Sequence, residues 1–208
     1  MPRYRLHCFG ESGNAYKPAL YLALSGADWE PVYVNFFEGQ HRSAEFTAKN
    51  EAAQVPIMED GEITLSQSGL ILHYLQEQEG KFAPADAAEA REVMRWLFWD
   101  NYSFTSVLAP LRFIGHFMAP EKRDAGVLAF LGARMKTALK VLDRRLADRD
   151  WVAAAGPTIA DFSIVGYLYY DGELPLDLTE YPNVVAWLGR LRALPGWVGP
   201  YDLMPRRG

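Results

Sequence analysis

Apolar and polar positions alternate at the start of the chain. Within residues 3–9 every second side chain is apolar, which predicts a strand with one buried face. A turn cluster follows at residues 10–14. Apolar positions at three- and four-residue steps then predict a helix that ends near residue 26, with Pro18 in its first turn. Residues 29–34 predict a second strand, which is parallel to the first because a helix connects the two.

The strongest local pattern follows a polar loop and a predicted short helix at residues 43–49. Two short apolar runs flank an Asp-Gly turn, which predicts a β-hairpin. A helical pattern comes next, with Ser66 as the predicted N-cap. Gln67 and Ser68 then fall in the first turn, where free N–H groups and the helix dipole favour a carboxylate. The resulting order, βαβαββα, predicts a thioredoxin-like α/β domain over residues 1–80.

The rest of the chain has a helical pattern almost throughout. Residues 81–88 are the predicted linker, and residues 89–208 the predicted all-helical domain. Its first helix is long and aromatic, with Pro110 as a kink or a break, and Pro120 opens the next helix. The stretch 158–161 is a capping box, with an Asp side chain that reaches back to a Thr N–H, in front of a helix that is apolar on every side and therefore buried.

Composition narrows the classes of function. The net charge is −5 without a run of Lys or Arg, which argues against nucleic acid and anionic membranes as partners. No apolar stretch reaches the ~20 residues of a membrane span, and the start of the chain lacks the apolar core of a signal peptide. The single cysteine, Cys8, fits a reducing compartment, so we expect a cytoplasmic protein.

The dipeptide Val55-Pro56 allows two interpretations. Proline cannot donate to a sheet ladder, so a trans Pro56 would simply open an edge strand. A cis bond costs little before proline, and it would turn the N–H and C=O of Val55 outward, where they can pair with an extended peptide. The dipeptide alone does not decide between them.

These motifs, in this order and spacing, resemble the glutathione S-transferase family. The resemblance rests on Gln54-Val55-Pro56, the Asp-Gly hairpin, Gln67-Ser68 and the capping box, and it covers nearly the whole chain. It implies a thioredoxin-like domain followed by an all-α domain. In the family the proline is cis, the residue before it pairs with the cysteinyl part of glutathione, and a Gln-Ser pair binds the γ-glutamyl carboxylate.

The resemblance also implies further contacts in the site. A basic or amide side chain often binds the glycyl carboxylate, and His41 could take this role, as could Gln40 or Lys49. The second substrate, an electrophile, would bind in a pocket lined by aromatic side chains, for which the candidates are Phe9, Trp99 and Tyr102.

The chemistry requires a donor to the glutathione sulfur. The thiol has a reference pKa near 8.5, so only a few per cent is thiolate at pH 7, and a catalyst must stabilise the anion. The turn after the first strand holds Ser12 and Asn14. The resemblance to serine-type members assigns the donor to Ser12, and that to a disulfide-reducing subset assigns it to Asn14. Either residue could instead only cap the helix.

Other chemistries find little support in the sequence. Cys8 lies within the first strand, where it is expected to be a small buried side chain. The four His residues lack metal-ligand spacing. We therefore expect a homodimeric glutathione transferase that activates the thiolate against a small electrophile. The alternatives are a glutathione-dependent disulfide reductase or isomerase, and a glutathione-binding interaction module without turnover.

Overall fold

The computed structural model describes residues 2–206 and divides the chain into two compact units. Unit 1 holds the described residues up to Ala83 together with those from Leu194 onward, and unit 2 holds Pro84–Ala193. Unit 1 is a thioredoxin-like α/β unit and unit 2 is all-helical, so the predicted fold class is confirmed. The domain bounds from the sequence stay a prediction, and the contacts of the C-terminal segment with unit 1 add a feature that the pattern did not contain.

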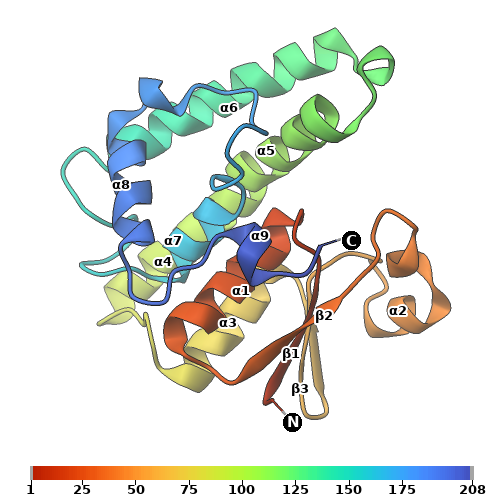
Figure 1. Cartoon of the computed structure of the whole chain (residues 1–208). Coiled ribbons are helices and arrows are strands. Elements are labelled where there is room, and N and C mark those ends of the chain that lie inside the picture. Colours follow the sequence, from red (N-terminus) through yellow and green to blue (C-terminus); the bar gives the residue numbers. More distant parts are fainter. Residues whose placement is uncertain (1, 207–208) are drawn as a thin grey trace. The chain divides into compact units, whose positions relative to one another are not determined.

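Unit 1 follows the predicted order of elements (Figure 1). Its elements are β1 (Tyr4–Cys8), α1 (Gly13–Ser25), β2 (Trp29–Tyr33), a 3-10 turn (Gln40–Arg42), α2 (Ala44–Lys49), β3 (Ile57–Asp60), β4 (Ile63–Ser66), α3 (Ser68–Glu79) and, near the C-terminus, α9 (Pro200–Leu203). The sheet order is β2-β1-β3-β4, with β1 and β2 parallel and β3 antiparallel to both of its neighbours. Helices α1 and α3 pack against each other on one face of the sheet, and α2 lies on the other side (Figure 1).

The first strand and helix depart from the sequence prediction in two places. His7, expected on the open face of β1, is buried, and its Nε2 lies 3.2 Å from the Glu59 carboxylate. Pro18 lies in the second turn of α1 instead of the first, because the helix begins as early as Gly13. Gly26 ends the helix in the left-handed conformation, with φ 67°, as a helix C-cap requires.

The entry to α3 also differs from the prediction. Ser66 is not the N-cap, because it still belongs to β4 and pairs with Ile57. The cap position falls on Gln67, and Ser68 is the first residue of the helix. Sheet pairing has extended the strand by one residue beyond the point that the local pattern indicated.

Unit 2 consists of helices (Figure 1). They are α4 (Ala87–Trp99), a π-helical segment (Asp100–Phe104), α5 (Thr105–Arg112), a second π-helical segment (Phe113–Phe117), a 3-10 turn (Pro120–Lys122), α6 (Ala125–Arg145), α7 (Ile159–Ile164), 3-10 turns (Val165–Tyr167 and Leu178–Glu180) and α8 (Pro182–Arg192). A break at Pro110 is not found, because Pro110 lies inside α5, and the helical stretch changes to π-helix at residues 100–104 and 113–117 instead. Pro120 opens only a 3-10 turn, and Asp124 caps the long helix behind it.

The predicted capping box is confirmed. The Asp161 carboxylate accepts from the Thr158 N–H at 2.9 Å, and every residue of α7 behind it is buried.

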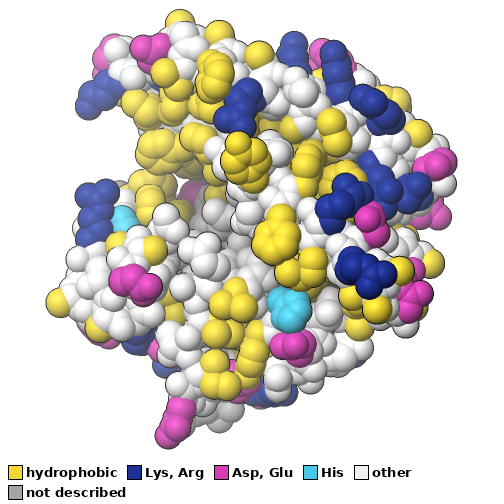
Figure 2. All heavy atoms as spheres, turned by 180° about the vertical axis from the view of Figure 1, so that it is seen from behind, with side chains coloured by type: hydrophobic (Ala, Val, Ile, Leu, Met, Phe, Trp, Pro, Cys, Tyr) yellow, Lys and Arg dark blue, Asp and Glu magenta, His cyan; other side chains and the backbone are white. Residues whose placement is uncertain are grey.

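In the part of the chain that the structure describes, no helix combines the length and the apolar character that a membrane span needs. Figure 2 shows apolar side chains exposed among groups of basic and acidic ones on one face of the molecule.

Candidate functional site

Several loop segments of unit 1 meet at one edge of the sheet because of the strand registers. β1 ends at Cys8, and β3 pairs with it so that Ile57 stands opposite His7. The residues just before Ile57 therefore lie beside the end of β1. Ser66, the last residue of β4, also pairs with Ile57, so the entry to α3 reaches the same edge. β2 ends there as well, with Tyr33 opposite Cys8.

Two helix N-termini open at this edge. Helix α1 follows the end of β1, and α3 follows the end of β4, so both helices begin where those strands end. The first N–H groups of a helix lack intrahelical partners, and the macrodipole adds a partial positive charge there. The edge is therefore suited to an extended, anionic ligand.

Ser12 is the N-cap of α1. Its Oγ accepts a hydrogen bond from the Ala15 N–H at 3.2 Å, and the residue is 6% exposed. A hydroxyl that accepts through one lone pair still has its own proton to donate. The capping role and a role as donor to a sulfur are therefore compatible in one side chain.

Asn14 lies in the first turn of α1 and is half-buried. Among the described residues, no side-chain hydrogen bond holds its amide. The Asn14 amide therefore does not cap the helix, and it can donate to a ligand at the same edge. Both candidate donors belong to this turn, which leaves the choice between them to experiment.

The Val55–Pro56 peptide bond is cis, as the family resemblance implies. The Val55 side chain packs on a small cluster of Val34, Phe46 and Ile57. Among the described residues no hydrogen bond holds its N–H or its C=O. The backbone of Val55 is therefore anchored by its side chain and available to an extended ligand, while the Gln54 carbonyl accepts from Asn50 Nδ2 at 2.7 Å.

Gln67 and Ser68 stand at the start of α3. Gln67 is exposed and has φ 70° and ψ 112°, a backbone conformation that residues other than glycine rarely adopt. Ser68 is 6% exposed, and no side chain caps the helix. A backbone conformation of this kind at a helix start with free donors points to a binding role.

An aromatic cluster borders the same edge of unit 1. The Phe9 and Phe36 rings stack with centroids 4.8 Å apart, and the Phe36 and His41 rings stack at 4.2 Å. Phe37 packs edge-on against Phe9, at 6.0 Å, and is 45% exposed. Phe36 is not predicted from the sequence, because nothing in a loop sequence indicates that two rings stack.

His41 is buried, although most loop histidines are solvated. Burial is the main cause that lowers the pKa of its imidazole, and Arg42 adds to the effect, so the ring is neutral near pH 7. Its Nδ1 is buried and has no partner among the described residues. Two other candidates for the glycyl carboxylate already have partners, since Gln40 Oε1 accepts from the Asn35 N–H and Lys49 pairs with Glu59.

The remaining candidates for an electrophile pocket belong to unit 2. Trp99 is half-buried and packs against Trp96 and Phe104, whereas Tyr102 is 78% exposed. Asp100, between them, is fully buried and accepts from Thr105 and Ser163. Its carboxylate therefore stabilises the π-helical segment.

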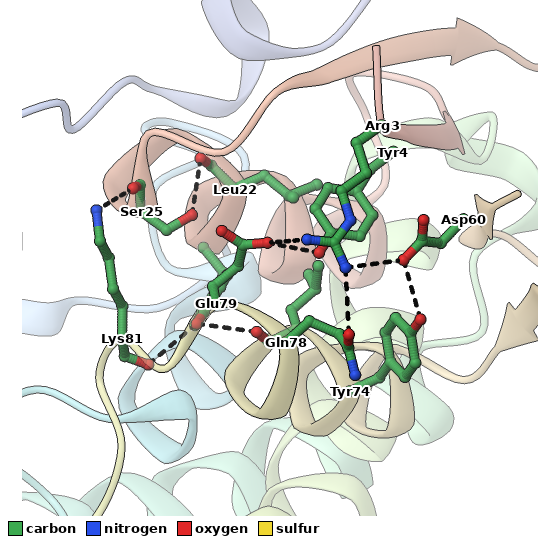
Figure 3. A network of polar contacts seen from close by, with 11 residues as sticks. Arg3, Tyr4, Leu22, Ser25, Asp60, Tyr74, Gln78, Glu79 and Lys81 are labelled. Atoms are coloured by element: carbon green, nitrogen blue, oxygen red, sulfur yellow. Dashed lines mark hydrogen bonds and ion pairs between the residues drawn. The ribbon is translucent and has the colours of Figure 1, made fainter.

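Two residues of β1, Cys8 at its end and Tyr4 at its start, are unsuited to thiol chemistry. Cys8 is fully buried, and burial raises the pKa of its thiol to about 12. The Tyr4 hydroxyl donates to Glu79 at 2.5 Å, and burial is the main cause that raises its pKa. Figure 3 shows Tyr4 in a polar network with Arg3, Asp60 and Glu79, around the start of β1 and therefore at the opposite end of that strand from Ser12. Among residues 2–206 no group of His, Cys, Asp or Glu is arranged to hold a metal ion.

Comparisons with known proteins agree with this architecture. The family models of the glutathione S-transferase N-terminal and C-terminal domains match residues 4–77 and 111–195. A glutathione S-transferase structure from Xanthobacter autotrophicus is 32% identical, with a TM-score of 0.86 over 96% of this chain and 98% of that one. A structure of glutathione S-transferase-I bound with lactoylglutathione is 26% identical, with a TM-score of 0.86 over 98% of this chain and all of the other.

One curated relative is named for a different activity. The disulfide-bond oxidoreductase YghU of Escherichia coli is 32% identical over 179 residues, which are 81% of this chain. The chain spans 62% of the length of YghU.

Proposed function

Because the chain belongs to the glutathione S-transferase family, we propose that it binds glutathione in unit 1 and activates the thiol for attack on a small electrophile. The observation that carries the proposal is the meeting of three segments at one edge of the sheet. They are the turn with Ser12, the cis Val55–Pro56 segment and the start of α3.

Each part of glutathione finds a chemical partner in this arrangement. The γ-glutamyl carboxylate would accept from the N–H groups at the start of α3 and from Gln67 and Ser68. The cysteinyl backbone would pair with the free N–H and C=O of Val55, as an added strand does. The glycyl carboxylate would lie towards the neutral imidazole of His41, which can donate one hydrogen bond.

The sulfur would then lie at the start of α1. There the Ser12 hydroxyl donates to the thiolate while its oxygen continues to accept from Ala15, and Asn14 assists. The helix dipole lowers the thiol pKa further. The aromatic cluster of Phe9, Phe36 and Phe37 offers an apolar surface to the electrophile. A role of Trp99 or Tyr102 in electrophile binding rests on the family resemblance alone.

Disulfide reduction is the second candidate. It is supported by the free amide of Asn14 beside Ser12 and by the similarity to YghU. In that reaction two glutathione molecules are oxidised to their disulfide while the substrate disulfide is reduced to two thiols. The same thiolate site serves both reactions, so substrates must distinguish them.

We further propose a homodimer. The family resemblance implies it, and exposed apolar side chains support it. Phe98 and Tyr102 are four positions apart, at the end of α4 and in the adjoining π-helical segment, and are 67% and 78% exposed.

The experiment for the main proposal combines binding and turnover. Calorimetry with glutathione measures affinity, and conjugation of 1-chloro-2,4-dinitrobenzene is compared with glutathione-dependent disulfide reduction. Conjugation as the dominant activity supports the transferase. Dominant disulfide reduction supports the second candidate. Binding without either activity would indicate an interaction module, and absence of binding would contradict all three.

The donor is identified by the ultraviolet titration of the bound thiolate. Ser12→Ala should raise the pKa of the bound thiol by about 1–2 units, equivalent to about 1.4–2.7 kcal/mol. Asn14→Ala should give a smaller shift. Ser43→Ala is a matched control, because Ser43 Oγ caps α2 with the same 3.2 Å bond to a backbone N–H. The control should lose a helix cap and leave the thiol pKa unchanged. A larger shift in Asn14→Ala than in Ser12→Ala would reverse the assignment and favour the second candidate.

A further inference from the structure

The C-terminal segment of the chain runs back along α1 to the turn that carries Ser12. At the far end of α1, a Cβ built on Gly196 would lie 3.4 Å from the Ala23 carbonyl oxygen. In the middle of the path the Tyr16 hydroxyl donates to the Val198 carbonyl at 2.8 Å. The segment, which includes α9, crosses α1 in Figure 1, and its last described residues lie beside Gly10.

The turn between β1 and α1 receives two contacts from this segment. The turn is closed by the Ser12 N–H, which donates to the Phe9 carbonyl at 3.0 Å, so Gly10 and Glu11 are its two central residues. The Gly10 N–H donates to the Pro205 carbonyl at 2.7 Å. The Glu11 side chain, only 10% exposed, pairs with Arg206 Nε at 3.3 Å.

Both contacts depend on particular residue types. A Cβ on Gly10 would lie 2.6 Å from Arg206 Cγ and 3.2 Å from Tyr201 Cδ1, so any other residue would displace these side chains. The Arg206 guanidinium also lies over the Tyr201 ring, 3.7 Å from its centroid, which restricts its position. The Glu11 carboxylate is nearly buried, and pairing with a cation such as Arg206 offsets part of the cost of burying its charge.

We infer that Arg206 and the Pro205 carbonyl are positioning groups for the thiolate donor at Ser12, and this rests on the proposed function. The Gly10–Glu11 turn determines where the α1 N-cap stands, and with it the direction of the Ser12 hydroxyl. Small displacements of a donor reduce its effect on the transition state strongly. The C-terminal segment therefore acts on the thiol through the turn, without a contact to the sulfur.

The test uses the full-length chain with Arg206→Ala, Glu11→Gln and the double variant. Arg192→Ala is the matched control, because Arg192 is similarly exposed, pairs with Asp171 and lies 4.9 Å from the Tyr169 ring centroid. The first readout is hydrogen exchange of peptides that cover residues 9–15, measured without ligand. Arg206→Ala should accelerate exchange there, and Arg192→Ala should not.

The second readout is the pKa of the glutathione thiol bound to each variant. Arg206→Ala should raise it by about 0.5–1 unit, which lowers the thiolate fraction about three- to tenfold below that pKa. The glutathione Kd, measured where the thiol is neutral, should change less than twofold. If Arg206 acts through Glu11, its replacement should add little in the Glu11→Gln background.

The outcomes separate this inference from the proposed function. If wild-type protein binds no glutathione, the proposed function fails and the inference falls with it. If wild-type protein binds and lowers the thiol pKa but Arg206→Ala leaves that pKa unchanged, the inference alone is overturned, even where exchange becomes faster. An equal pKa shift in Arg192→Ala would overturn it as well, because the effect would then be general.

Discussion

At the scale of single residues, Gln67 combines a rare backbone conformation with a place at the start of α3. Its φ of 70° and ψ of 112° suit glycine better than any residue with a Cβ, and such conformations cost about 1–3 kcal/mol. A residue that adopts such a strained conformation is expected to contribute to function, here to the binding of the γ-glutamyl carboxylate.

We expect Gln67→Gly to raise stability and weaken binding together. Glycine relieves the backbone strain, but it also gives the unfolded chain more conformational freedom, which offsets part of that benefit. The free energy of unfolding should therefore rise by about 1 kcal/mol, or about 2–4 °C in Tm. Loss of the amide should raise the glutathione Kd about tenfold, the worth of one charge-assisted hydrogen bond. Differential scanning calorimetry and titration calorimetry measure the two effects.

Gln67→Ala is the control, since it removes the amide and keeps a Cβ. Its Kd should rise as in Gln67→Gly, but its Tm should not. A gain in Tm for Gln67→Gly with an unchanged Kd would assign the conformation to folding alone.

At the scale of elements, the buried helix α7 depends on the carboxylate of Asp161. The residue is fully buried and accepts four hydrogen bonds at 2.9–3.1 Å. The donors are the Val152 and Thr158 N–H groups, the Thr158 hydroxyl and the Trp187 indole. One side chain thus joins the start of α7 to the preceding loop and to α8.

Asp161→Ala should lower the free energy of unfolding by at least about 3 kcal/mol, because it leaves several buried donors without a partner. Asp124→Ala is the control. Asp124 caps α6 at the surface with a single bond to the Val127 N–H, at 2.9 Å, and its loss should cost only about 1 kcal/mol. Urea unfolding of both variants measures the difference. Equal losses of unfolding free energy would show that burial does not increase the contribution of the Asp161 capping box.

At the scale of the whole molecule, stability should depend on pH through buried charge on the sheet. His7 is buried on β1, within 3.2 Å of Glu59, which also pairs with Lys49 and Arg5. Burial is the main cause that lowers the pKa of His7 below 6.5, although Glu59 opposes it. For Glu59, burial acts to raise the pKa, but the contacts with Lys49 and His7 prevail and lower it.

The sign of the effect follows from proton binding. In the unfolded chain His7 takes up its proton near pH 6.5, and in the folded chain only at lower pH. The stability that it contributes is therefore complete above pH 6.5 and is lost as the pH falls through the folded pKa. We expect Tm to fall between pH 7 and pH 5, and His7→Gln should reduce this slope.

His73→Gln serves as the control for this prediction. His73 lies on the surface of α3 beside Glu77, where its side chain is 40% exposed, and its replacement should change the slope less than His7→Gln does. Scanning calorimetry at several pH values compares the variants. An identical slope in His7→Gln and wild type would show that other groups cause the acid sensitivity.

The proposed homodimer also belongs to this scale. Sedimentation velocity at micromolar concentration should show a dimer, because exposed Phe98 and Tyr102 would lose their contact with water on association. Phe98→Glu should shift the equilibrium towards monomer. Val185→Glu, on α8 at 44% exposure, is the control and should leave the dimer intact. A monomeric wild-type chain would contradict the proposal.

The sequence by itself determined the features that local patterns encode. Strand β1, the β3–β4 hairpin and the capping box of α7 depend on neighbours along the chain, and all three are found. Two details differ: the buried His7 breaks the alternation in β1, and the two turn residues of the hairpin are Gly61 and Glu62, because Asp60 pairs with Ile63. The family resemblance added the cis Val55–Pro56 bond, which is also found. The roles of Ser12, Asn14, Gln67 and Ser68 stay predictions.

Only the tertiary structure decided the features that depend on distant residues. The burial of His7 and the stacking of Phe36 on His41 need partners far along the chain, or a loop shape, that no period reveals. The contact of Pro205 and Arg206 with the turn before Ser12 joins residues almost two hundred positions apart. Such contacts arise from packing in three dimensions, where close approach depends on the whole fold and not on local spacing.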